Sequence, residues 1–222
     1  MSETDSFIDE VTEEVRRDRL FATFRKYGWI GIALVLVIVG GAAWNEWQKA
    51  QARAGAQAFG DAVVAALASD DPAARVAALD SVGSNASGDS AGQKAVLGFL
   101  AADEALRGGD RAGALTRLEA LAEDAALSAT YRQLARLKAV ILAGPSMEPA
   151  TRDTALADLA QPGAPFRALA MEQQALALMA DGKNDEALAL ARQILEEPDA
   201  TAGLRRRVTQ LIVVLGGDPE AA

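Results

Sequence analysis

The residue types that most often carry out chemistry in proteins are scarce in this chain. Its 222 residues include no cysteine and no histidine. A thiolate nucleophile, a disulfide framework, the commonest general base and the commonest metal ligand are therefore all missing. Carboxylate pairs alone can hydrolyse glycosides, but Asp and Glu are scattered here along helical patterns that favour solvated surface. We expect a protein that is not an enzyme and that uses no cofactor or metal.

Two short motifs have a functional and a structural interpretation. Three consecutive arginines, 205–207, would suit an acidic partner or lipid headgroups, whereas their place in a helix beside Glu196 and Glu197 is typical of solvated surface. Gly182-Lys183 lacks the glycine spacing of a phosphate-binding loop and is interpreted as a turn. Neither motif predicts a reaction.

The charge of the chain argues against nucleic acid as a partner. From Trp47 onward there are 17 Lys and Arg against 23 Asp and Glu. Nucleic-acid binding needs a clustered basic face, and this portion is net acidic. We expect protein partners.

The elements that would position any site are helices almost throughout. Ala, Leu, Arg, Gln and Glu dominate after Gln48, and these residues lose least on entering a helix. Proline at expected helix starts and glycine at expected ends mark the boundaries. The predicted helices span residues 47–68, 72–83, 91–107, 111–123, 128–143, 150–160, 165–181, 184–196 and 200–215.

One apolar segment near the N-terminus predicts a membrane span. Tyr27 to Asn45 holds nineteen residues without a charge, about 28 Å of helix against a hydrocarbon core of about 30 Å. Tyr27, Trp29, Trp44 and Trp47 flank it, as interfacial aromatics do. The alternatives are the core helix of a soluble protein or a signal peptide, but no clean small-residue cleavage site follows. We expect the span to be retained.

The orientation of that span follows from the basic residues beside it. Five Lys and Arg precede it, and only Lys49 and Arg53 follow closely, so the positive-inside rule puts the N-terminus in the cytoplasm. The predicted organisation is a cytoplasmic amphipathic leader at 1–26, a transmembrane helix at 27–47 and a periplasmic domain at 48–222. The location would be a bacterial inner membrane.

The helices after the span look like repeated pairs. Residues 95–126 resemble a tetratricopeptide unit, with a turn at Gly109-Asp110 and Ala114 early in the second helix. A second copy at 168–199 has Ala187 as the counterpart of Ala114. Degenerate pairs would occupy 59–82 and 131–160. The predicted fold class is all-α, a single N-terminal transmembrane helix followed by an α-solenoid of tetratricopeptide-like helix pairs; the alternative is a generic helical bundle.

The order of these features resembles a known family. The leader from Phe7 to Gly28, the span ending in Trp44 and Trp47, and the following AQARAGAQAFGDAVVAAL helix are similar to the bacterial ancillary SecYEG translocon subunits. The resemblance implies a periplasmic scaffold at the translocon that contacts periplasmic chaperones or exported clients. A coordinator of envelope assembly or cell division built on the same repeats is the alternative.

A partner surface is expected on the first helix of each pair, which mainly forms the concave face of a solenoid. The polar residues predicted there are a mixed-charge set suited to weak contact with many proteins. They are Gln93, Lys94, Asp103, Arg132, Gln133, Arg136, Gln173 and Gln174.

Overall fold

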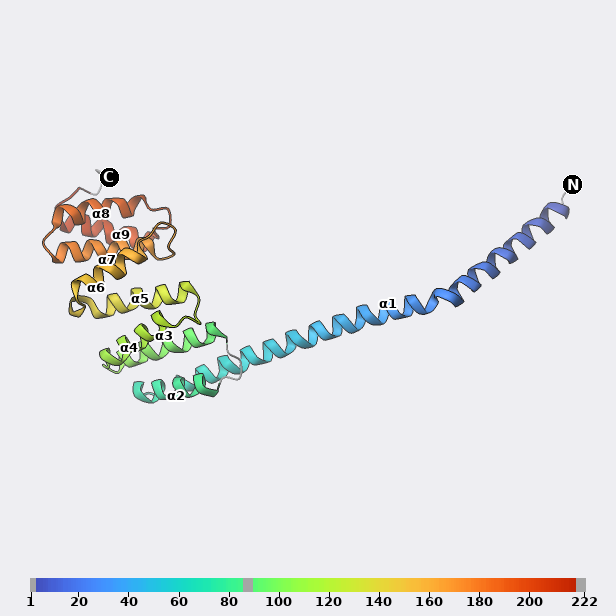
Figure 1. Ribbon diagram of the computed structural model, residues 1–222, viewed down its shortest axis with the longest axis horizontal. Coiled ribbons are helices and arrows are strands. Elements are labelled where there is room, and N and C mark those ends of the chain that lie inside the picture. The colour runs from blue at the N-terminus through green and yellow to red at the C-terminus, as the bar shows by residue number, and fades with distance from the viewer. Residues whose placement is uncertain (1–2, 86–89, 219–222) are drawn as a thin grey trace. The chain divides into compact units, whose positions relative to one another are not determined.

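The structure, a computed structural model, describes residues 3–85 and 90–218, with side chains described at 25, 26, 29–84 and 90–218. Every regular element in these residues is a helix, which confirms the predicted all-α class. The elements, labelled in Figure 1, are α1 (Glu3–Ala66), α2 (Pro72–Asn85), α3 (Ala91–Arg107), α4 (Arg111–Glu123), α5 (Ala129–Ala143), η1 (Gly144–Ser146), α6 (Pro149–Leu159), α7 (Arg167–Ala180), α8 (Asn184–Glu196) and α9 (Ala202–Val214). The chain divides into two compact units, Met1–Ala58 and Phe59–Ala222.

The first unit is formed by α1 up to Ala58, and the last turns of α1 belong to the second unit. We predicted a separate helix starting near residue 47, and that start is wrong, because α1 runs without a break from Glu3 to Ala66. The sequence has no proline before Pro72, so nothing removes a backbone donor along this stretch. Side chains of the leader before Arg25 lie outside those that the structure describes.

Within α1 lies the only described helix long and apolar enough to cross a membrane, Trp29–Ala66, with a mean hydropathy of 1.6. None of its most apolar stretch is buried. Trp44 and Trp47 contact each other with ring centroids 5.2 Å apart. Large apolar side chains left in water are costly, at about 25 cal/mol per Å².

The second unit is a stack of helices in which each helix from α2 to α9 packs on the next (Figure 1). Its apolar side chains form clusters that each join three successive helices. Leu79 of α2, for example, lies with Ala66 of α1 and Leu97 of α3, and Leu156 of α6 lies with residues of α5 and α7. Since no pair buries its apolar surface alone, each pair depends on its neighbours.

Local signals set the helix boundaries. Ser90, Asp110, Ser128 and Thr201 each accept a hydrogen bond from the backbone N–H three residues on, as N-cap side chains do. Glycines end the first helices of the two predicted repeats. Gly109 and Gly182 have φ of +83° and +75°, a backbone conformation that residues other than glycine rarely adopt.

Small residues lie where helices approach closely. Ala114 and Ala187, the two predicted equivalents, are both completely buried. A Cβ on Gly98 of α3 would come within 2.8 Å of the Leu121 side chain on α4. The two predicted positions are therefore buried as expected, and Gly98 is a further close approach that the sequence did not predict.

Candidate functional site

The eight predicted partner-binding residues lie on α3, α5 and α7, and only Lys94 and Arg136 are exposed. Several of them make contacts within the protein. Asp103 accepts a hydrogen bond from Lys138 at 3.1 Å, which joins α3 to α5, and Arg132 donates to the carbonyl of Leu127 at 2.7 Å. Half-buried Gln93, Gln133, Gln173 and Gln174 complete the set.

Three hollows indent the second unit in a repeated arrangement. Each lies between the second helices of two successive pairs and has the intervening first helix at its base. Their volumes are about 490 Å³ between α2, α3 and α4, about 460 Å³ between α4, α5 and α6, and about 260 Å³ between α6, α7 and α8. Gln93 and Lys94 line the first, Arg136 the second and Gln174 the third. Asp103, Arg132, Gln133 and Gln173 line none of these three hollows.

Ion pairs within the protein balance the charges of the first hollow. Arg117 donates to both carboxylate oxygens of Asp80 at 2.8 Å, and this hydrogen bonding raises the pKa of the arginine. Lys94 contacts Asp124 at 2.7 Å, and its hydrogen bond lowers the pKa of that carboxyl. Two cations thus meet two carboxylates.

The third hollow also has two cations and two carboxylates, but here one arginine contacts both carboxylates. Arg152 contacts Asp153 at 2.9 Å and Asp181 at 3.4 Å, and hydrogen bonding to Asp153 raises the pKa of the arginine. Lys183 also lines it. Both outer hollows therefore carry no formal excess charge.

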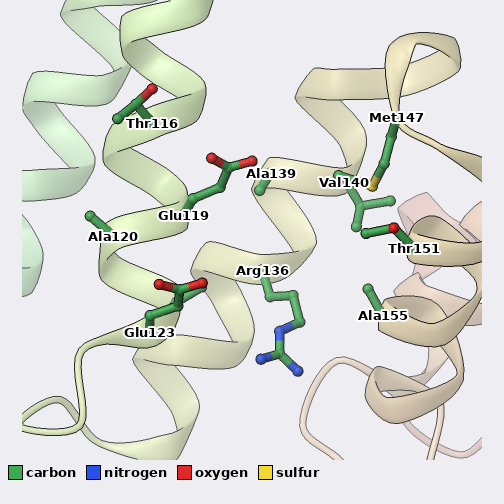
Figure 2. Close-up of a pocket in the computed structure, with 11 residues that line it drawn as sticks. Thr116, Glu119, Ala120, Glu123, Arg136, Ala139, Val140, Met147, Thr151 and Ala155 are labelled. Carbon is green, nitrogen blue, oxygen red and sulfur yellow. The ribbon is translucent and has the colours of Figure 1, made fainter.

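The middle hollow differs. Figure 2 shows Glu119 and Glu123 of α4 on one wall and Arg136 of α5 beside them. Neither glutamate has an ion-pair partner among the described residues, whereas Arg136 lies 3.5 Å from Asp158 of α6. The opposite wall is mostly apolar, with Val140, Met147 and Ala155, and also carries Thr151. This hollow offers carboxylates and apolar surface together.

Sequence reasoning missed the two glutamates because it expected contacts on the first helix of each pair, and α4 is a second helix. The signal was present in the spacing. Glu119 and Glu123 are four residues apart and share one helix face, while Leu118 and Leu121 are buried. The sequence predicts two acids on the solvent face of one helix, but it does not predict which residues of α5 and α6 lie beside them.

The arginine run at 205–207 has structural roles. Arg205 donates to carbonyl oxygens of Leu195 in α8 and of Glu197 and Ala200 just beyond it. Arg207 binds both oxygens of buried Glu172 at 2.6 and 2.8 Å, and this raises its pKa. Two of the three guanidiniums hold α9 against the preceding helices.

Across the described residues, no group of three or more acidic side chains is arranged to hold a metal ion. Glu104 is a buried acid and forms an ion pair with Arg75 of α2. The other buried acid in the described part is Glu172. Both pairs join helices, and neither lines one of the three hollows.

Comparison with protein families matches the tetratricopeptide repeat-like domain to residues 21–211, most of the chain. Comparisons with curated proteins and with solved structures gave no match. The matched stretch covers both predicted repeats, the degenerate pairs and the apolar segment. The match agrees with the stacked helix pairs and with the small residues at their contacts. The chain belongs to the tetratricopeptide repeat-like domain family.

Proposed function

We propose that this protein is a membrane-anchored scaffold that binds other proteins through the helix pairs of its second unit. The observation that carries the proposal is the row of hollows along a tetratricopeptide repeat-like stack. Domains of this kind serve in protein–protein interaction, and solenoids offer extended surfaces for it. Domains of this kind are typically scaffolds without a catalytic site.

An anchor is supported by the apolar part of α1. Its exposed side chains include Leu34, Leu36 and Val37, each more than half accessible. A lipid environment would remove the cost of exposing them. The family match begins at residue 21 and so contains the whole segment, which favours a retained anchor over a removed signal peptide.

The finer proposal is that the second unit lies in the periplasm of a bacterial inner membrane and works at the Sec translocon, where it aids the hand-over or folding of exported proteins. The five-to-two excess of Lys and Arg before the span supports this orientation. The order of leader, span and first following helix supports the translocon as the partner. Chaperones and exported clients would then be bound by the helix pairs.

Reporter fusions test the orientation. A reporter active only in the periplasm should be active after residue 222 and silent when fused at residue 2. The reverse pattern would contradict both the orientation and the translocon assignment.

Photo-crosslinking in intact membranes tests the partner. A photo-reactive residue placed at Leu36 in the apolar segment should crosslink to a translocon subunit, and one placed at Gln93 or Arg136 to exported proteins or their chaperones. Crosslinks to cell-wall enzymes or division proteins instead would favour the envelope-assembly alternative. Crosslinks to lipid alone at every position would refute a scaffold.

A further inference from the structure

We propose that the middle hollow, between α4, α5 and α6, binds a Lys or Arg side chain of a partner polypeptide together with an apolar residue beside it. This proposal rests on the proposed scaffold function and adds the chemistry of the partner. It concerns the hollow of about 460 Å³ shown in Figure 2.

Charge distinguishes this hollow from its two neighbours. The first and third contain equal numbers of cations and carboxylates, and some of their ion pairs join helices, as Arg117 of α4 does with Asp80 of α2. The middle hollow has Glu119 and Glu123 against Arg136, whose guanidinium already lies beside Asp158. A positive charge brought by a partner would reduce this excess of negative charge.

The spacing of the two glutamates favours the binding of a cation. Like charges four residues apart on a helix repel each other, and neither carboxylate has a cation from this protein among the described residues. A cation between them would relieve that repulsion and contact both carboxylates. Both side chains are exposed at the wall of the hollow, so a partner can reach them.

The remaining lining suits the stem of such a side chain. Lys and Arg carry three or four methylene groups that pack on apolar surface while the charged end reaches a polar group. Val140, Met147 and Ala155 supply that surface opposite the glutamates. Met147 adapts its shape readily, which fits a site that accepts the same chemistry from different sequences.

A polypeptide fits the arrangement better than a small free cation. Ala120 of α4 lines both the first and the middle hollow, so only a small side chain separates them. A segment crossing α4 at this point would pass from the first hollow to the acidic wall of the middle one. A free polyamine would use the carboxylates alone.

The test uses the full chain in nanodiscs of zwitterionic phosphatidylcholine and a fluorescein-labelled peptide, Gly-Ser-Leu-Lys-Leu-Ala-Ser-Gly, with binding read as fluorescence anisotropy. The double substitution Glu119→Gln with Glu123→Gln should weaken binding about tenfold. Glu186→Gln with Glu196→Gln makes the same charge change on exposed residues of α8, outside the three hollows, and should leave binding unchanged. A second variant, Thr116→Lys, adds a cation to the hollow and should also weaken binding.

Peptides with glutamate or norleucine in place of lysine identify what is recognised. The expected result is no measurable binding of the glutamate peptide and weaker binding of the norleucine peptide. Equal binding of the norleucine peptide, equal binding to the Glu119 and Glu123 variant, or no binding to the unaltered chain would overturn the proposal. Spermidine binding that needs both glutamates, without peptide binding, would also overturn it in favour of a small-cation site.

The same variants in cells separate this proposal from the scaffold function. Photo-crosslinks to partners that persist in the Glu119 and Glu123 variant would overturn the middle hollow as the binding site and leave the scaffold function intact. Absence of partner crosslinks in the unaltered chain would refute the scaffold function itself.

Discussion

Replacing Ala114 or Ala187 with leucine should destabilise the second unit, because both side chains are completely buried at equivalent places in two helix pairs. Ala112 and Ala189, two residues away on the same helices, are exposed and provide the matched controls. The comparison tests the repeat register directly, since a shift of the register would exchange the buried and exposed positions.

Two opposing terms set the change in the free energy of unfolding. A leucine adds three carbon atoms, and burying them in empty space would stabilise the fold by about 2 kcal/mol. Neither alanine has accessible surface, so the atoms have no space to occupy without moving a helix. Overpacking of this kind costs about 1–3 kcal/mol net. For a domain of this size the melting temperature would fall by about 2–12 °C.

The assay is thermal and urea unfolding of the fragment from residue 51 to 222, followed by far-ultraviolet circular dichroism. The fragment contains none of the three tryptophans, which all precede residue 51, so half-buried Tyr131 serves as the tertiary probe. Ala112→Leu and Ala189→Leu should change stability by no more than about 0.5 kcal/mol. Equal tolerance at all four positions would refute the register, and a larger loss at the exposed pair would indicate a shifted one.

Three further outcomes are expected. The fragment beginning at Gln51 should be soluble and helical without detergent, because its apolar stripes bury one another; aggregation or a coil spectrum would contradict this. Arg207→Met should cost about 1–2 kcal/mol in urea unfolding, since it leaves buried Glu172 unpaired while water screens the half-exposed guanidinium, and Arg206→Met, at an exposed neighbour, should cost little. Hydrogen bonds from the backbone N–H groups of Ala150 and Thr151 lower the pKa of Glu148 in the folded state. The ionised side chain therefore stabilises the fold fully above the unfolded-state pKa of about 4.3. This stabilisation is lost as the pH falls through the lower folded-state pKa. Glu148→Gln should therefore flatten the acid side of the stability profile, and an unchanged profile would show that these hydrogen bonds do not stabilise the fold.

The sequence alone predicted most of the helix boundaries and the presence of one apolar span. The turns at Gly109 and Gly182 and the caps at Ser90 and Asp110 are local, because each involves residues no more than a few positions apart. The predicted helix start near residue 47 was wrong because no local signal ends the preceding helix. Where local signals were clear, prediction and structure agree within two residues from α3 onward.

Only the tertiary structure decided which charges are paired. Glu172 and Arg207 are 35 residues apart and Arg75 and Glu104 are 29 apart, so no helical period relates them. The same holds for the middle hollow, where Glu119 of α4 meets surface from α5 and α6. A polar residue's role depends on which helix packs against it, and the stacking of pairs fixes that through apolar contacts between three successive helices. The sequence shows which faces are polar, whereas the stack determines which polar side chains remain without a partner in the protein.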